Sequence, residues 1–224
     1  MNNPMRRNII LTPLLYQTII WGMLSSIFYI ISFKLLDLPI ANFFHIHHRQ
    51  SLSMLCQIIA LIFDPDIWII VMVFCGLIAL YQLVFKKQSQ NSAWLKIALS
   101  LFIAAAVATL LKFVIGRYRP IMYFEHGLYG FHHFSTKGSQ HSSPSGHAAM
   151  AFSGLLAIAS CFRKRAWTIF AVILATLICL SRLIITKHYL ADVMLGAYIG
   201  IFSYFWGSQF IEIFANYWHS KIRK

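Results

Sequence analysis

Acidic residues are scarce in this chain of 224 residues, which carries six Asp and Glu against 19 Lys and Arg. The six are Asp37, Asp64, Asp66, Glu125, Asp192 and Glu212. A site for Mg²⁺ or Ca²⁺ gathers several carboxylate or carbonyl oxygens around one ion. Carboxylates this few and this scattered argue against such a cage, so we expect no metal and no other cofactor.

Paired cysteines are lacking as well. The four cysteines, Cys56, Cys75, Cys161 and Cys179, lie in apolar segments without paired spacing. Isolated cysteines of this kind behave as small buried apolar residues, not as disulfides or zinc ligands. They therefore identify neither a redox site nor a metal site.

Charge of either sign makes up only 11% of the residues, while 59% are hydrophobic and the mean hydropathy is +0.68. Soluble domains carry about 25% charged residues. The composition therefore predicts an all-α polytopic membrane protein, formed by residues 1–224 as a single bundle. The net charge of +13 would suggest nucleic acid in a soluble protein. Here the basic residues lie mostly in short loops, where they set membrane topology, and we expect no nucleic-acid partner.

Long apolar runs predict six transmembrane helices, because a helix needs about 20 residues to cross a bilayer. The predicted spans are residues 14–33, 67–85, 93–115, 147–162, 167–185 and 189–213. A signal peptide is the alternative for the first run, but its length and the lack of a small-residue cleavage site favour an uncleaved span. Residues 35–63 are interpreted as an interfacial segment, because their apolar part, 52–63, is too short to cross.

The basic residues between these spans predict the orientation. Arg6–Arg7, Lys86–Lys87, residues 163–165 and the basic tail all fall on one side of a six-span bundle. The positive-inside rule makes that side cytoplasmic, with both termini inside. The long connection 116–145 and residues 186–188 then face outward. We expect the inner membrane of a bacterium, with this face toward the periplasm.

Ionisable residues gather at the outward ends of four predicted helices, although such groups are costly in a membrane and usually functional there. They are Lys112 near the end of the third span and Arg119 after it, His147 at the start of the fourth, Arg182 in the fifth, and His188 and Asp192 at the sixth; Ser145 and Gly146 directly precede His147. His188 and Asp192 are four residues apart and share a face if this segment is helical. A carboxylate that accepts from one imidazole nitrogen fixes the tautomer and makes the other nitrogen a better nucleophile.

The start of the fourth span resembles an anion cradle. Its first amides lack intrahelical partners and lie at the positive end of the helix dipole, and Gly146 permits a close approach of the backbone. Together with Lys112, Arg119 and Arg182, this predicts a phosphate site beside two histidines.

Each component also has an ordinary explanation. Lys112 alone would be a snorkelling lysine, Ser145 a helix cap and His147 an interfacial histidine. Arg117 is interpreted as a contact to lipid headgroups. The loop histidines, His126, His132, His133 and His141, match no zinc spacing, and we expect them to be solvated or to touch headgroups.

Three motifs carry a family resemblance. Lys112 with Arg119–Pro120, then residues 144–147 (Pro-Ser-Gly-His), then Ser181–Arg182 with His188 and Asp192 are similar to the three-part signature of the type 2 phosphatidic acid phosphatase superfamily. The resemblance covers about residues 60–213. Ser143 departs from it, because relatives often have an aromatic residue there, and this difference concerns the headgroup pocket.

The resemblance implies a membrane lipid phosphatase that needs no metal. It implies that Lys112, Arg119, Arg182, Ser145 and Gly146 bind the phosphate. His188 would attack phosphorus and form a phosphohistidine, Asp192 would orient His188, and His147 would protonate the leaving oxygen.

Several substrates and two other functions stay open. Candidate substrates are undecaprenyl pyrophosphate, lipid A, phosphatidylglycerophosphate and phosphatidic acid, and the basic, His-rich loop slightly favours lipid A. The alternatives are a lipid phosphotransferase and a non-catalytic lipid-phosphate binding protein.

Overall fold

The computed structural model describes residues 4–47, 50–85 and 93–222, and within these residues every regular element is a helix. The longer elements are α1 (Pro4–Ile31), the π-helix η1 (Ser32–Leu36), α2 (Asp37–Ile46), α3 (Gln50–Ile62), α4 (Pro65–Val84), α5 (Ala93–Ile115), α7 (Gly146–Cys161), α8 (Arg165–Ile184) and α9 (Leu190–Ile222). Two short helices, α6 (Pro120–His126) and the 3₁₀ turn η2 (Gly138–Gln140), lie in the long connection between α5 and α7. The predicted all-α membrane class is confirmed.

The predicted count of six spans is not confirmed. Five helical stretches among the described residues are long and apolar enough to cross a membrane: Thr12–Ile46, Gln50–Val84, Ala93–Ile115, Arg165–Ile184 and Leu190–Ala215. The fourth predicted span corresponds to α7, which has 16 residues and so falls short of the usual length of about 20. Twelve of its residues are buried, because α5, α8 and α9 surround it.

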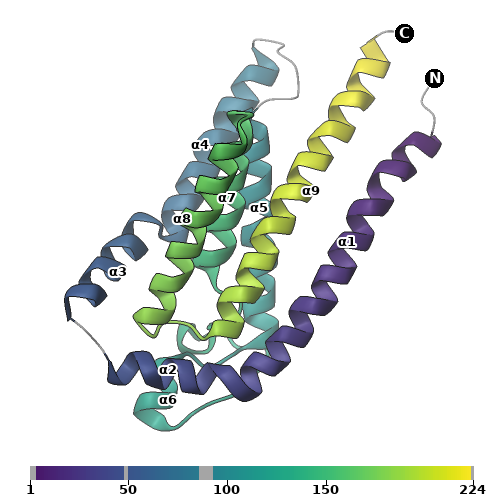
Figure 1. Ribbon diagram of the computed structural model, residues 1–224. Coiled ribbons are helices and arrows are strands. Elements are labelled where there is room, and N and C mark those ends of the chain that lie inside the picture. The colour runs from purple at the N-terminus through teal and green to yellow at the C-terminus, as the bar shows by residue number, and fades with distance from the viewer. Residues whose placement is uncertain (1–3, 48–49, 86–92, 223–224) are drawn as a thin grey trace.

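The interfacial interpretation of residues 35–63 stays a prediction, and the two helices of this segment run in different directions. At η1 the first helix bends, and α2 then lies across the end of the bundle (Figure 1). In contrast, α3 rises along α8 toward the start of α4. The small buried residues Ser53, Cys56 and Ala60 share one face of α3. A face of small side chains allows close contact with α8, which explains why this short helix packs on the bundle.

Glycines bring α9 into close contact with the central helices. A Cβ atom on Gly196 would lie 2.5 Å from the carbonyl oxygen of Ser145, and one on Gly200 would collide with the backbone of Ala149. Small residues at such contacts let two membrane helices pack backbone to backbone. The N-terminal end of α7 is therefore held directly against α9, near Asp192.

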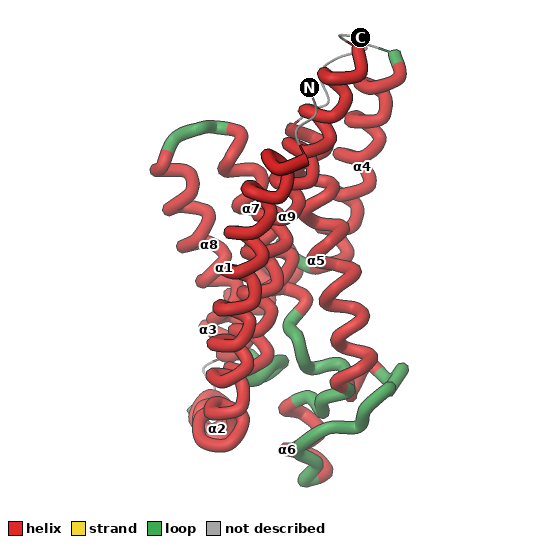
Figure 2. Tube along the Cα trace, turned by 90° about the vertical axis from the view of Figure 1, so that its right-hand side faces the viewer, coloured by secondary structure: helices red, strands yellow, loops and turns green. Residues whose placement is uncertain are grey.

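The two ends of the bundle differ in character. The beginning of α1, the end of α4 and the end of α9 lie at one end, while α2, α6 and the loops around them lie at the other (Figures 1 and 2). The described beginning of α1 and end of α9 therefore lie at the same end of the bundle, and the side of the membrane on which this end lies stays a prediction. Lys86 and Lys87, which contributed to that prediction, lie outside the described residues.

Candidate active site

His188 lies in the short connection between α8 and α9 and is only 4% exposed. Its Nδ1 atom is 2.8 Å from the carbonyl oxygen of Ser142. A carbonyl oxygen can only accept, so Nδ1 carries the proton of the neutral ring and Nε2 carries the lone pair. In this tautomer Nε2 is the nitrogen that could act as a nucleophile.

Asp192 approaches His188 less directly than the sequence predicts. Its Oδ2 atom is 3.9 Å from Nδ1 of His188, which exceeds a hydrogen bond. The same oxygen accepts the hydroxyl of Ser142 at 2.6 Å and the amide of Tyr189 at 2.9 Å. Asp192 therefore fixes Ser142 and the start of α9, and Ser142 in turn holds the imidazole.

The charge state of His188 follows from its surroundings. Burial lowers the pKa of its imidazole well below the ordinary value, and the positive charges of Arg119, Arg182 and Lys112 lower it further. These three cations, which the sequence predicts as phosphate ligands, thus lie near enough to act electrostatically on His188. A neutral His188 at physiological pH is the form that can act as a nucleophile.

Each of the three cations is held in a different way. The Nζ atom of Lys112 lies 3.1 Å from the position that a Cβ atom on Gly146 would take, at the N-terminus of α7. Nε of Arg119 donates to the carbonyl of Gly138 at 2.9 Å. Arg182 is 7% exposed, and within the described part of the chain its Nε has no hydrogen-bond partner. An unsatisfied buried guanidinium is the kind of group that an anion would satisfy.

Ser145 begins α7 as its N-cap, with its hydroxyl accepting the amide of Ala148 at 3.5 Å. Its own amide donates to the carbonyl of Asp192 at 2.9 Å. The second and third motifs are thus joined through the backbone. A phosphate contact from Ser145 and Gly146 stays a prediction.

His147 has a partner that sequence reasoning missed. Its Nε2 atom lies 3.6 Å from Oδ2 of Asp64 and 3.3 Å from the carbonyl of Ala60. Asp64 also caps α4, because its Oδ1 accepts the amide of Asp66 at 2.9 Å. Its contact with His147 could be suspected only from the scarcity of acids in the chain.

Arg117 is where the sequence interpretation was wrong. Arg117, which was predicted to contact lipid headgroups, is fully buried. Its guanidinium pairs with Asp192 at 2.7 Å and with Asp37 at 2.6 Å. A charged side chain in a polar loop gives the same sequence pattern whether it points outward or inward. The partner carboxylate, Asp37, begins α2 and is fully buried as well.

The long connection is ordered by its own contacts. His141 Nε2 lies 2.7 Å from the carbonyl of Ser135, and His133 Nδ1 lies 3.2 Å from that of Val114. Tyr129 and Phe131 both stack on Phe33. Among the described residues, no group of three or more His, Cys, Asp or Glu side chains is placed to hold a metal ion.

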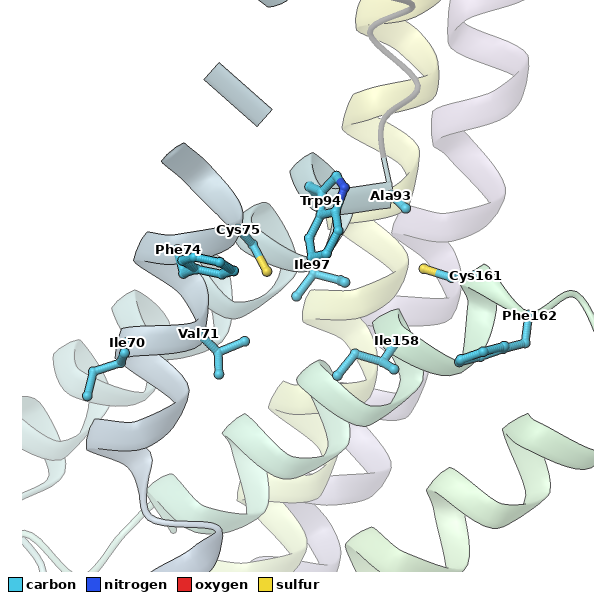
Figure 3. Close-up of a pocket in the computed structure, with 10 residues that line it drawn as sticks. All are labelled: Ile70, Val71, Phe74, Cys75, Ala93, Trp94, Ile97, Ile158, Cys161 and Phe162. Carbon is cyan, nitrogen blue, oxygen red and sulfur yellow. The ribbon is translucent and has the colours of Figure 1, made fainter. Parts of the chain in front are cut away.

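Two sizeable cavities lie away from these polar residues. One, of about 540 Å³, lies between the middle of α4, the start of α5 and the end of α7, and Cys75 and Cys161 are among its lining residues (Figure 3). The other, of about 710 Å³, lies between α1 and α9. Both have mainly apolar linings, as expected of grooves between membrane helices, and neither includes a predicted site residue.

The fold and the site together define a membrane-embedded helical bundle with a buried histidine among three cations. Residues 93–214 match the model of the PAP2 superfamily, and the chain belongs to this family. The match contains all three sequence motifs.

Similar proteins with curated names agree over part of the chain. Proteins named lipid A 1-phosphatase from Rhizobium etli and Rhizobium johnstonii are each 28% identical to it over 117 residues, which is 51% of this chain and 50% and 47% of theirs. The chain thus spans about half the length of the curated relatives that it matches.

Solved structures support the fold. Aquifex aeolicus LpxE has a TM-score of 0.55 at 21% identity, covering 77% of this chain and 94% of that one. The first transmembrane PAP2-type phosphatidylglycerolphosphate phosphatase from Bacillus subtilis has a TM-score of 0.59 at 17% identity, covering 88% and 96%.

Proposed function

We propose that the protein is a membrane lipid phosphatase that cleaves a phosphate or pyrophosphate ester through a phosphohistidine. The observation that carries the proposal is the buried His188, whose Nδ1 donates to the carbonyl of Ser142 while the positive charges of Lys112, Arg119 and Arg182 act on its imidazole. A neutral, oriented imidazole next to concentrated positive charge suits attack on a phosphate group.

The cations would serve the transferred group. Charge in the transition state of phosphoryl transfer is spread over three equatorial oxygens. Lys112, Arg119 and Arg182 would neutralise these oxygens, and Ser145 with the amide of Gly146 would add donors at the helix N-terminus.

The reaction would proceed in two balanced steps. Nε2 of His188 forms a bond to phosphorus as the bond to the leaving oxygen breaks, and His147 gives that oxygen its proton. A water molecule then attacks phosphorus, and His147 takes a proton from it. The phosphorus–nitrogen bond breaks, inorganic phosphate leaves, and both histidines return to their starting states.

The site would face outward across a bacterial inner membrane, with both termini in the cytoplasm. The support is the basic turn at residues 163–165, on the far side of the bundle from the site. The lipid would enter sideways between helices.

Among the candidate lipids, lipid A is favoured by the names of the curated relatives and by the basic loop. Undecaprenyl pyrophosphate, phosphatidylglycerophosphate and phosphatidic acid are the comparison substrates.

The test is phosphate release from these four lipids by the purified protein, with EDTA and without an acceptor lipid. We expect release that is lost in His188→Ala and in His147→Ala, and an acid-labile phosphoenzyme that forms only while His188 is present. His126→Ala is the matched control, because His126 lies in the loop with 57% of its side chain exposed. Turnover by His188→Ala would reject the nucleophile. Binding without release by the wild type would reject the hydrolase and favour the binding protein.

A further inference from the structure

Behind the candidate site lies a buried ionic cluster that none of the three motifs contains in full. Arg117 donates from Nη1 to Oδ1 of Asp192 at 2.7 Å and from Nη2 to Oδ2 of Asp37 at 2.6 Å. All three side chains are completely buried. Asp37 lies outside residues 93–214, the part that matches the family model, so a segment beyond the family core supplies one carboxylate.

Asp37 also contacts the first turn of α9, directly beside Asp192. Its Oδ1 atom accepts the amide of Ala191, next to Asp192, at 3.0 Å and the hydroxyl of Ser32 at 2.7 Å. Ser32 and Asp37 bracket η1, where the amide of Asp37 donates to the carbonyl of Ser32. π-helical turns of this kind frequently occur at functional sites. Here the extra residue in the turn places a carboxylate inside the bundle.

The charges of the cluster do not cancel. One guanidinium faces two carboxylates, so a net negative charge remains. Burial alone would lower the pKa of Arg117, but the attraction of Asp192 and Asp37 outweighs it and the pKa lies above its ordinary value. Arg117 thus stays charged and pairs with Oδ1 of Asp192, while Oδ2 of Asp192 accepts from Ser142 and Tyr189.

Aromatic rings leave the guanidinium little freedom to move. Its Cζ atom lies between 4.4 and 6.0 Å from the centroids of five rings. They belong to Tyr29, Phe33, Tyr129, Phe131 and Tyr189. Rings at this distance attract a cation and exclude water from it. Both carboxylates are therefore held by a planar fork in a fixed orientation, a geometry that a lysine cannot reproduce.

We propose that Arg117 and Asp37 are positioning residues for the reaction, which align Asp192 so that it holds Ser142, and through Ser142 the nucleophile His188. The amide of Ser142 also donates to the carbonyl of Arg117 at 3.0 Å, so backbone and side chain of Arg117 act on the same link. This inference rests on the proposed function.

The experiment measures kcat and KM for lipid phosphate hydrolysis, together with the rate of phosphoenzyme formation, in full-length protein. The variants are Arg117→Lys, Asp37→Asn and Ser142→Ala. The control is Thr18→Val, which removes the hydrogen bond from Trp206 to Thr18 between α9 and α1 at 3.0 Å and leaves the cluster intact. Size-exclusion profiles and melting temperatures establish that each protein is folded.

We expect kcat and phosphoenzyme formation to fall by about 10²-fold in Arg117→Lys and Asp37→Asn, the scale on which misplacing a reacting group acts, while KM changes little. Thr18→Val should keep the wild-type kcat. A purely structural role predicts instead that folded Arg117→Lys retains its kcat. The Arg117→Lys and Ser142→Ala losses should also be non-additive, because both variants interrupt the same link.

The outcomes separate the two claims. An active wild type beside a folded Arg117→Lys with unchanged kcat overturns this inference and leaves the proposed function standing. A wild type that releases no phosphate overturns the proposed function and the inference with it. If Arg117→Lys and Asp37→Asn do not fold, Ser142→Ala tests the inference. This variant removes the hydrogen bond from Ser142 to Asp192 without leaving a buried charge unpaired. Unchanged kcat in that variant also overturns the inference.

Discussion

Nε2 of His147 lies 3.6 Å from Oδ2 of Asp64, although Asp64 precedes α4 and His147 lies in the first turn of α7. The side chain of His147 is 10% exposed and that of Asp64 37%, so the histidine is the more buried partner. A carboxylate in that place stabilises the protonated imidazole that a general acid requires. Asp64 would thus favour the acid form of His147.

Replacing Asp64 with Asn should therefore lower kcat by about 10-fold, part of the 10²–10⁴ that general acid–base catalysis supplies. Asn caps helices as well as Asp does, so stability should change little. Asp66→Asn is the matched control. Asp66 is exposed, and this substitution removes the same charge from a residue that does not contact His147. Steady-state rates of the two variants give the comparison. Equal kcat in both would remove Asp64 from the reaction.

The buried neutral His188 makes stability depend on pH with a defined sign. Its pKa is lowered in the folded state, whereas in the unfolded chain it is near 6.5. Below about pH 6.5 the unfolded state binds a proton that the folded state does not, so stability falls as pH falls, by at most about 1.4 kcal/mol per pH unit. In His188→Asn this contribution should disappear.

Unfolding by denaturant between pH 7.5 and 5, in wild type and His188→Asn, measures the difference. A parallel decline in the two proteins would mean that His188 is not the buried neutral group. The same lowered pKa predicts that His188 stays a neutral nucleophile at pH values below 6.5. Protonation of His188 should therefore not lower kcat/KM just below that pH.

The helical bundle was predictable because apolar runs of sufficient length have few other uses. The end of the first span near residue 33 was also predictable, because Lys34 and Asp37 are the first charged residues after Arg7. The π-helical geometry of η1 was not, since composition does not encode it. The short α7 was taken as a span because it is an apolar run. Its hydrophobic surface is covered by neighbouring helices, and burial in protein and burial in lipid leave the same sequence signal.

The site residues were predictable where the functional groups lie close together in sequence. His188 and Asp192 are one helical turn apart, and Ser145 to His147 open a helix. The pairing of Arg117 with Asp37 spans two distant segments and leaves no local pattern. Arg117 was misplaced because an arginine beside a membrane helix commonly contacts headgroups. The scarcity of acids was the available signal, since a carboxylate such as Asp37 within an apolar run needs a partner.

Close packing of α9 on α7 predicts a steric effect at Gly196. A Cβ atom there would lie 2.5 Å from the carbonyl of Ser145 and 2.9 Å from the Cβ of Ala148. Because one of these is backbone, Gly196→Ala must push the helices apart, which should cost about 1–3 kcal/mol of stability and reduce activity by straining the bond from Ser145 to Asp192. Melting temperature and kcat report both effects.

Gly76→Ala is the control for that substitution. Its added Cβ would meet Ala98 at 3.9 Å, an ordinary contact, and alanine favours a helix over glycine by about 0.5–1 kcal/mol. This variant should be at least as stable as wild type. If Gly196→Ala were equally stable, the contact between α7 and α9 would be looser than the structure has it.

Orientation across the membrane can be tested by cysteine labelling at the two ends of the bundle. Thr136, in the loop between α5 and α7, and Lys164, in the turn before α8, are both exposed. In a background without the four native cysteines, Thr136→Cys should react with an impermeant maleimide on intact cells, because its end of the bundle is expected to face outward. Lys164→Cys lies among the basic residues that are retained in the cytoplasm, so it should react only after the membrane is permeabilised. The reverse pattern would place the phosphate site on the cytoplasmic face, where a lipid such as lipid A would have to be met before its export.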